Sequence, residues 1–229
     1  MVRAHEHERR YAEHRDGDLK VAVIDDEPAL LRALARLMKS AGIEATTFSS
    51  AHEFLGDPIH QQVDCAVTDL RMPGVDGLKL QEELSATLPC LSLVFLTGHG
   101  NVPSSVKAMQ GGAVDFLEKP VDGQALLAAV RRAAERSRAL KASCDELTAF
   151  KLRYEELTAR ERQVFVLITA GLLNKQAAAD LGVVEKTVKV HRARVMEKMG
   201  ADSLAELVRM AERLGVRKAN ATNIPSRSR

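Results

Sequence analysis

Short apolar runs alternate with helical patterns through the first half of the chain. Runs at 20–24, 44–48, 63–69, 91–96 and 113–117 have the length and composition of buried strands. Between them, apolar residues recur at helical spacing, which predicts helices near 28–41, 51–55, 78–86 and 103–110. Strands that alternate with helices predict an α/β fold, in which a parallel sheet in the flavodoxin-like order 2-1-3-4-5 is covered on both faces.

A different apolar period begins after Gly123. Apolar or small residues are spaced alternately by four and three, the period of a coiled-coil seam, at Leu126, Val130, Ala133, Ser137, Leu140, Cys144 and Leu147. No Gly or Pro stands between Gly123 and Gly171, so we expect the last helix of the first domain to continue through the linker to about Tyr154. The alternative is a helix that ends near Leu140, followed by a loose polar linker.

The last part of the chain carries four short helical patterns. Thr158 and Glu161 form a capping box at the start of the first helix, Asn174 is expected to cap the second, and Gly182 makes the turn before the third. The expected helices span 158–171, 174–181, 184–199 and 203–215. Two short helices joined by a tight turn that contains Gly predict a helix-turn-helix in an all-α domain.

These patterns divide the chain into a disordered tail (1–18), an α/β domain (19–125), a helical linker (126–154), the helix-turn-helix domain (155–217) and a disordered basic tail (218–229).

The net charge of +2 is distributed unevenly along the chain. Residues 19–125 hold 8 Lys and Arg against 14 Asp and Glu, whereas 126–154 hold 7 against 3 and 155–217 hold 11 against 9. An acidic N-terminal half and a basic C-terminal half predict different partners for the two halves of the chain.

Composition indicates where the protein acts. The three cysteines are odd in number and lack metal-ligand spacing, which is typical of reduced thiols in a cytosolic protein. The first 18 residues contain no apolar segment of the kind found in secretion signals, and no apolar run approaches the roughly 18 residues of a membrane span. We therefore expect a cytoplasmic protein with no membrane partner.

Charged and polar residues stand where the expected strands end. Asp25 and Asp26 follow the first strand, Asp69 ends the third, Thr97 follows the fourth and Lys119 follows the fifth. In the order 2-1-3-4-5 the first and third strands are neighbours at the switch point, so the three carboxylates converge there. They repel one another unless a cation shares the site, and oxygen ligands without Cys or His favour Mg²⁺. A carboxylate, a metal and an ammonium group are what phosphoryl transfer to an acid requires.

Each of these residues also has a purely structural interpretation. Asp25 and Asp26 could cap the following helix, Thr97 could be a turn residue, and Lys119 could lie in a solvated loop. Their occurrence in order at successive strand ends favours the functional interpretation.

Four segments of residues 20–122 carry a family pattern: VAVIDDEP, VTDLRMPGVDG, VFLTGHG and GAVDFLEKP. In order and spacing they resemble the motifs of response-regulator receiver domains. The resemblance implies that Asp69 accepts a phosphoryl group from a sensor histidine kinase. It also implies that Mg²⁺ binds between Asp25, Asp26, Asp69 and the backbone carbonyl of Arg71. Thr97 and Lys119 would hold the phosphoryl oxygens, and Phe116 would be the aromatic residue that rotates inward.

The third helix of the all-α domain is basic. It carries Lys186, Lys189, Arg192, Arg194 and Lys198 against Glu185 and Glu197. The amino end and middle of such a helix are where a recognition helix contacts base edges. A solvated helix face, or a helical hairpin that contacts another protein, would have the same charge pattern.

The stretch from LTARERQV to GADSLAELV is similar from end to end to the LuxR/FixJ-type helix-turn-helix. With the receiver motifs, nearly the whole chain resembles a response regulator of the NarL/FixJ subfamily. The resemblance implies that Lys175 contacts phosphate, and that Arg192 and Arg194 add backbone or base contacts. The residues implied to line the major groove are Thr187, Lys189, Val190 and His191. The sequence departs from the family at Gln176, where an apolar Ile is common.

Together these features predict a transcription factor, not a metabolic enzyme. Phosphorylation of Asp69 is expected to favour a homodimer that binds double-stranded promoter DNA and works with RNA polymerase. One alternative is a hydrolase with Asp69 as nucleophile. Such enzymes require a second acidic residue two positions after the nucleophile, and Arg71 occupies that position here. The other is a DNA-binding regulator that does not depend on phosphorylation and whose receiver is only a dimerisation scaffold.

Overall fold

The computed structural model describes residues 19–98 and 102–216, apart from the side chains of 102 and 103. The tails predicted at 1–18 and 218–229 lie outside the described residues. The chain divides into two compact units between Lys141 and Ala142, called here the N-terminal unit and the C-terminal unit.

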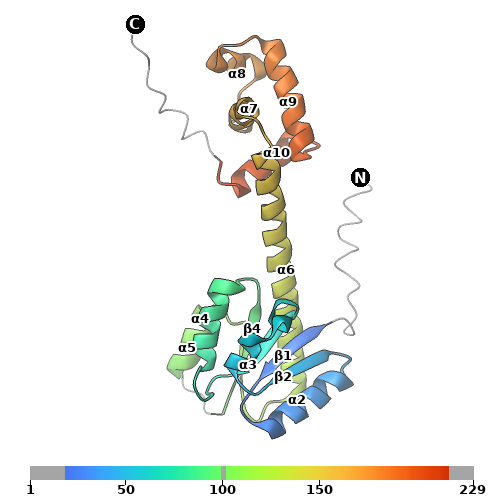
Figure 1. Cartoon of the computed structure of the whole chain (residues 1–229), viewed down its shortest axis with the longest axis vertical. Coiled ribbons are helices and arrows are strands. Elements are labelled where there is room, and N and C mark those ends of the chain that lie inside the picture. The colour runs from blue at the N-terminus through green and yellow to red at the C-terminus, as the bar shows by residue number, and fades with distance from the viewer. Residues whose placement is uncertain (1–18, 99–101, 217–229) are drawn as a thin grey trace. The chain divides into compact units, whose positions relative to one another are not determined.

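The N-terminal unit is built on a five-stranded parallel sheet in the order β2-β1-β3-β4-β5 (Figure 1). The strands are β1 (Lys20–Ile24), β2 (Glu44–Phe48), β3 (Cys65–Asp69), β4 (Ser92–Thr97) and β5 (Asp115–Glu118). This order confirms the predicted flavodoxin-like fold. Because β1 and β3 pair in register, with Ile24 opposite Thr68, the residues that follow them reach the same edge of the sheet.

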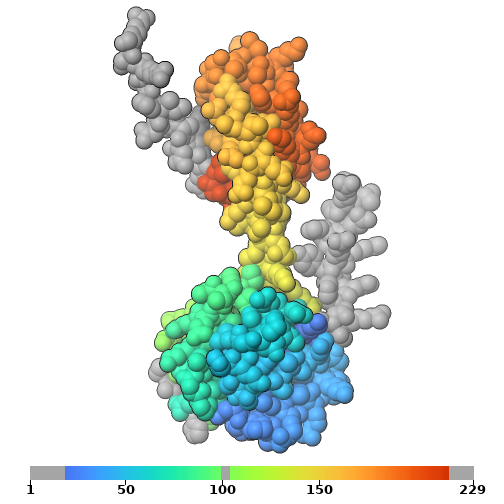
Figure 2. Space-filling model, viewed as in Figure 1, coloured from blue at the N-terminus to red at the C-terminus, as the bar shows by residue number. Residues whose placement is uncertain are grey.

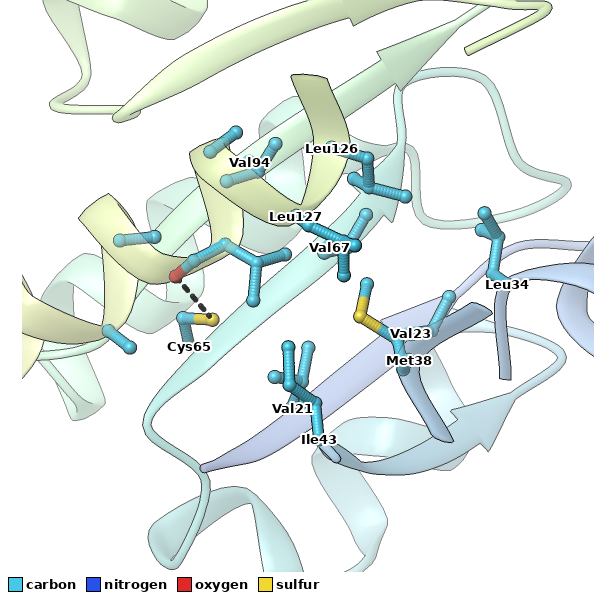
Figure 3. Packing of buried hydrophobic residues seen from close by; sticks show 14 of the residues in the cluster. Val21, Val23, Leu34, Met38, Ile43, Cys65, Val67, Val94, Leu126 and Leu127 are labelled. Atoms are coloured by element: carbon cyan, nitrogen blue, oxygen red, sulfur yellow. Dashed lines mark hydrogen bonds between the residues drawn. The ribbon is translucent and has the colours of Figure 1, made fainter. Parts of the chain in front are cut away.

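Alternate residues of the strands face opposite sides of the sheet. One side packs against α2 (Pro28–Ser40) and the first turns of α6 (Gly123–Glu155). Figure 3 shows Leu34 and Met38 of α2, and Leu126 and Leu127 of α6, around the strand residues of this cluster. The thiol of Cys65 lies here, and burial raises its pKa to about 12.

The other side of the sheet is covered by α3 (Ala51–Gly56), α4 (Gly77–Thr87) and α5 (Val102–Gln110), and a short 3₁₀ helix, η2 (Pro58–Gln61), follows α3. Its core includes Phe54, Leu80, Leu84 and Phe95, none more than 2% exposed. Figure 2 shows that the cyan and green segments, which include α3 and α4, lie side by side on the face of this unit turned toward the viewer.

Three strands begin later than predicted. The third was expected at 63–69 and spans Cys65–Asp69, the fourth was expected at 91–96 and spans Ser92–Thr97, and the fifth was expected at 113–117 and spans Asp115–Glu118. Ala113 follows Gly112, whose φ of +91° belongs to the turn after α5. Ala113 is therefore buried beside this turn and not within the regular strand, and Val63 and Leu91 pack against the same core ahead of their own strands. Apolar runs mark burial, which extends beyond the hydrogen-bonded ladder.

Helix α6 runs from Gly123 to Glu155, which confirms that the helix continues through the predicted linker. Its coiled-coil spacing does not form one seam. Leu126, Val130 and Ala133 are fully buried in the core of the N-terminal unit, whereas Leu140 is 39% exposed and Cys144 is exposed. The first part of the pattern thus records packing against the sheet and not against a partner helix.

The C-terminal unit contains the end of α6 and four helices: α7 (Ala159–Thr169), α8 (Asn174–Leu181), α9 (Glu185–Met199) and α10 (Leu204–Arg213). The capping box of Thr158 and Glu161 is present, as predicted. Residues from α7, α9 and α10 form its core, including Phe165, Val188 and Leu207, all fully buried.

The end of α6 belongs to this second core. Phe150 is buried in it, and the ring of Tyr154 meets that of Phe165 edge to face at 5.2 Å between centroids. Arg153 donates to the Met199 carbonyl at 3.0 Å, and Arg213 pairs with Glu146. The segment predicted as a linker therefore contributes its beginning to one core and its end to the other.

The predicted cap of α8 was wrong by one residue. Leu173, not Asn174, is the N-cap, and its backbone N–H donates to the side-chain oxygen of Gln176 at 2.8 Å. Asn174 is the first helical residue, and its side-chain oxygen accepts from Arg192 at 3.2 Å. An exposed Gln at this position thus serves the helix start, where an Ile could not accept the bond.

Candidate functional site

The backbone of the sheet fixes the edge where the predicted site lies. Asp25 follows β1, and its N–H donates to the Phe48 carbonyl of β2 at 3.1 Å. Asp69 and Thr97 are the last residues of β3 and β4. Lys119 follows β5, and its N–H donates to the Thr97 carbonyl at 2.7 Å. Four residues predicted from the sequence therefore stand at the carboxyl ends of neighbouring strands.

The Lys119 ammonium group joins the two buried carboxylates of this edge. Its Nζ is 2.7 Å from Asp25 Oδ2 and 3.2 Å from Asp69 Oδ1. The side chain of Asp25 is fully buried, that of Asp69 is 8% exposed and that of Lys119 is 15% exposed. The sequence predicted both Mg²⁺ and the Lys119 ammonium at this edge, and the structure places the Lys119 ammonium between Asp25 and Asp69.

The environment shifts the pKa of both partners. Burial raises the pKa of Asp69, against the opposing charge of Lys119, and the nearby Asp25 raises it further. For Lys119, burial disfavours the charged form. The hydrogen bond to Asp25 and the charges of Asp25 and Asp69 outweigh this effect and raise the pKa of Lys119. The site therefore holds a firmly charged ammonium beside a partly desolvated carboxylate.

The other two predicted metal ligands do not join this ion cluster. Asp26 is exposed, and Arg71 contacts Asp69 through its backbone N–H, which donates to Oδ2 at 3.2 Å. Within the part of the chain that the structure describes, no three His, Cys, Asp or Glu side chains are arranged to hold a metal ion.

Glu27 belongs to the cluster and was not predicted. Its N–H donates to Asp25 Oδ1 at 2.9 Å, and its carboxylate lies 3.5 Å from Lys119 Nζ with the side chain 65% exposed. Glu27 is also the N-cap residue of α2 and makes no side-chain cap bond. Neither Asp25 nor Asp26 caps this helix, so the structural alternative for that pair was wrong.

Thr97 and Phe116 lie on the same side of the sheet. Thr97 is 1% exposed, and Phe116 of β5 pairs in register with Phe95, two residues before Thr97. The Phe95 and Phe116 rings are 6.3 Å apart between centroids. Because alternate residues of a strand share a side, and paired residues of neighbouring strands do too, Thr97 and Phe116 face the same layer of helices.

The start of α4 approaches the Asp69 backbone closely. A Cβ atom on Gly77 would lie 2.4 Å from the Asp69 carbonyl oxygen and 2.9 Å from the Phe95 ring. The Gly77 N–H donates to the Leu70 carbonyl at 3.0 Å. Only a glycine allows this approach, which holds the backbone of Asp69 in place.

The predicted DNA-contacting residues lie on α8 and α9, around the Gly182 turn, whose φ is +64°. Their exposure differs. Lys175, Lys189, Val190 and Arg194 are exposed, whereas Thr187, His191 and Arg192 are half-buried. Lys189 pairs with Glu185 at 3.1 Å, and Arg192 is held by Asn174. The exposed set places three cations and Val190 at the surface, and Arg192 of the half-buried set links α9 to α8 through Asn174.

The comparisons with known proteins cover both units. Residues 21–131 match the family of response regulator receiver domains, and residues 155–211 match the luxR family of bacterial regulatory proteins. Nodulation protein W of Bradyrhizobium diazoefficiens is 45% identical over 202 residues, which are 88% of this chain and 88% of that protein. The chain belongs to the response regulators. Its receiver domain and LuxR-type helix-turn-helix place it in the NarL/FixJ subfamily.

Two further relatives have the same organisation as this response regulator. The transcriptional regulatory protein FixJ of Azorhizobium caulinodans is 46% identical over 88% of this chain and 96% of that protein. The solved structure of response regulator StyR has a TM-score of 0.74 and 40% identity, and covers 85% of this chain and 98% of that one. None of the helices in the described ranges is long and apolar enough to cross a membrane.

The receiver domain contacts α6 beyond residue 131, where the match to the receiver family ends. Arg138 forms a two-point ion pair with Asp64 at 2.8 and 3.1 Å, and Asp64 also accepts from the Lys20 N–H at 2.9 Å. The Ser137 hydroxyl accepts from the N–H of Ser92 at 2.8 Å. These contacts attach α6 to the amino ends of β1 and β4 and to the segment before β3, opposite the edge that carries Asp69.

Proposed function

We propose that this response regulator is switched by phosphorylation of Asp69, with a sensor histidine kinase as donor, and that phosphorylation controls dimerisation and binding to promoter DNA. The observation that carries the proposal is the contact of the Lys119 ammonium with the two buried carboxylates, Asp25 and Asp69. Such a group serves a reaction that delivers negative charge to one carboxylate. The protein has no other catalytic role in this proposal.

The chemistry uses Asp69 as nucleophile. A carboxylate oxygen attacks the phosphorus atom of a phosphohistidine, a P–O bond forms, the P–N bond breaks and the leaving imidazole takes up a proton. Lys119 contacts the added phosphoryl oxygens and offsets their charge, and the Thr97 hydroxyl donates a hydrogen bond to one of them.

Mg²⁺ fits the donor chemistry of the site. Asp25, Asp26 and Asp69 offer carboxylate oxygens and Arg71 offers a carbonyl, the oxygen ligands that this ion prefers. When bound, Mg²⁺ supplies positive charge against the incoming phosphoryl group. Before phosphorylation, Lys119 offsets the charges of the same carboxylates.

The output is the helix-turn-helix. Movement of Thr97 toward the phosphoryl group leaves space that Phe116 fills, which remodels the face around β5 and favours a homodimer. Two α9 helices then read half-sites about 34 Å apart on double-stranded DNA, at promoters used by RNA polymerase. The exposed cations Lys175, Lys189 and Arg194 support this assignment.

The test compares wild type with Asp69→Asn, which keeps the shape of the side chain but lacks the nucleophile. Each is treated with acetyl phosphate and Mg²⁺, and mass in solution and affinity for a duplex selected from a random DNA library are measured. Glu83→Gln, an exposed site on α4, is the matched control. Only wild type and the control should dimerise and gain affinity.

The same measurements separate the alternatives. If Asp69→Asn also dimerises and binds, the receiver domain is a scaffold and phosphorylation is not the switch. If wild type turns over a phosphoester continuously and Asp69→Asn does not, the protein is a hydrolase.

A further inference from the structure

A cavity lies in the receiver domain at the amino end of β4. Ser92 and Leu93, which begin the strand, line it, whereas Thr97, which ends the strand, stands at the opposite edge with Asp69. The other walls come from α4, the turn after α5 and the exposed side of α6. The cavity encloses about 130 Å³, and a cavity of roughly 150 Å³ is enough to hold benzene. A molecule with about six or seven non-hydrogen atoms therefore fits.

Gln81 of α4 brings a polar group to this cavity. The residue is 6% exposed, and its Nε2 donates to the Ala108 carbonyl of α5 at 3.0 Å. Among the described residues, no donor reaches its Oε1. A Cβ atom on Gly111, which also lines the cavity, would lie 2.6 Å from this oxygen. The glycine thus leaves room for a buried acceptor, and such an acceptor favours a ligand that carries a donor.

Arg136 of α6 brings a charge to the cavity and is the one charged residue that lines it. A Cβ atom on Gly112 would lie 3.8 Å from its Nη2. The neighbouring Arg132 and Arg138 pair with aspartates, but within residues 19–98 and 102–216 no carboxylate pairs with Arg136. A guanidinium has planar donors that fit a carboxylate, so the cavity favours an organic anion.

The remaining walls are mostly apolar. They include four leucines: Leu84, Leu88, Leu91 and Leu93. An inorganic anion would leave this apolar surface uncovered, and an alkane would contact neither polar group. An amino acid would bring its ammonium close to Arg136, where like charges repel. A short carboxylic acid with a hydroxyl group matches the cation, the apolar walls and the acceptor together.

We propose that this cavity binds a short-chain hydroxycarboxylate. The carboxylate pairs with Arg136, the hydroxyl group donates to Gln81 Oε1, and the carbon chain packs against the leucines. The ligand contacts α4, β4, the turn after α5 and α6 together, so its binding stabilises the folded receiver domain. The inference does not depend on phosphorylation or on DNA binding, because the cavity shares no residue with either proposed site.

The test titrates the full-length, nitrogen-15-labelled protein with three probes. β-Hydroxybutyrate has both polar groups, butyrate lacks the hydroxyl group, and β-hydroxybutyramide lacks the charge. Nuclear magnetic resonance follows the backbone amides of Gly111 and Gly112 and the side-chain amide of Gln81. For a ligand of this size we expect a Kd on the order of 1–10 mM for β-hydroxybutyrate. Butyrate should bind about threefold to tenfold more weakly, and β-hydroxybutyramide about tenfold or more.

Two variants assign the polar contacts. Arg136→Met should weaken the binding of both carboxylates by about tenfold and leave the binding of β-hydroxybutyramide unchanged. Gln81→Met should bind β-hydroxybutyrate and butyrate with equal affinity. The matched control is Arg131→Met, since Arg131 is also exposed on α6 but lies about 140° around the helix from Arg136. Thermal melts without ligand confirm that each variant is folded.

Four results would overturn the proposal. The first is the absence of a shift at Gly111, Gly112 and Gln81 with β-hydroxybutyrate at roughly 50 mM, well above the expected Kd. The second is equal affinity of wild type for the three probes. The third is unchanged binding in Arg136→Met. The fourth is an equal loss in Arg131→Met, which would mean that the anions respond to the general charge of α6 and not to this cavity.

Discussion

The receiver site and the recognition helix both depend on lysine–carboxylate pairs, but in opposite surroundings. Lys119 is 15% exposed, and its partners Asp25 and Asp69 are 0% and 8% exposed. Lys189 and its partner Glu185 are 62% and 44% exposed. The first pair is removed from water and connects two strand ends, whereas the second lies within one helix and is screened by solvent.

The proposed function gives the two surfaces different tasks. Phosphoryl transfer adds charge at one atom, so the compensating ammonium must be fixed in advance in a poorly hydrated place. Binding to a DNA backbone spreads over many phosphates, so the cations must be accessible and must exchange partners readily. Burial therefore distinguishes a charge that supports chemistry from one that supports binding.

The largest effect should come from removing the buried ammonium. Lys119→Met leaves Asp25 and Asp69 close together without a cation, and we expect the free energy of unfolding of the receiver domain to fall by about 3–4 kcal/mol. Urea denaturation at neutral pH measures it. Mg²⁺ should restore part of the loss, because it offsets the same carboxylates.

Lys189→Met is the matched control on the exposed pair. It should change the stability of the DNA-binding domain by less than about 0.5 kcal/mol. Equal effects of the two substitutions would mean that burial does not distinguish the two pairs.

The DNA-binding domain also contains a charge pair whose carboxylate, Glu161, is buried, although its Lys198 partner is 33% exposed, and this pair provides a second test of the comparison. Glu161 accepts from Lys198 at 2.7 Å and from the Thr158 N–H at 2.9 Å, and its side chain is only 3% exposed. We expect Glu161→Gln to lower the free energy of unfolding by about 2 kcal/mol, because charge-assisted bonds are lost while the shape is kept.

The lowered pKa of Glu161 predicts in which direction this stability difference changes with pH. The hydrogen bond from Lys198 lowers the pKa of Glu161 from 4.5 to about 2, with help from the Thr158 N–H. Because the pKa of Glu161 is lower in the folded than in the unfolded state, its ionisation stabilises the folded state. This contribution is fully present above pH 4.5 and is lost as the pH falls toward 2. The stability difference between wild type and Glu161→Gln should therefore be smaller at pH 3 than at pH 6. A constant difference would exclude the charge as its source.

The sequence allowed the strand order and the main site residues to be predicted because both depend on backbone pattern. Apolar runs located the strands, and the parallel order then brought Asp25 and Asp69 to one edge. The part played by Glu27 could not be predicted, because the conformation of one exposed side chain determines its 3.5 Å approach to Lys119. Periodicity identifies the edge but not the side-chain rotamers.

The helix patterns show a second limit of the same kind. A spacing of four and three predicts an apolar stripe, but it does not say which surface covers the stripe. In α6 the stripe from Leu126 to Ser137 packs on the sheet of its own domain. Likewise, Lys198 was counted with the basic surface of α9, yet it is paired with the buried Glu161 of α7. Both require the tertiary structure, because local sequence does not encode the partner.

The smallest expected effect concerns the exposed pair itself. Lys189→Ala should leave folding unchanged and weaken binding to a selected operator duplex by about 1–2 kcal/mol, since one phosphate or base contact is lost and Glu185 is left unbalanced near the DNA. Titration at several salt concentrations measures the affinity and its salt dependence. Removing Glu185 as well should recover part of the loss, because its repulsion disappears. Unchanged affinity in Lys189→Ala would remove this lysine from the DNA interface, and the exposed Lys175 and Arg194 would then have to supply the contacts.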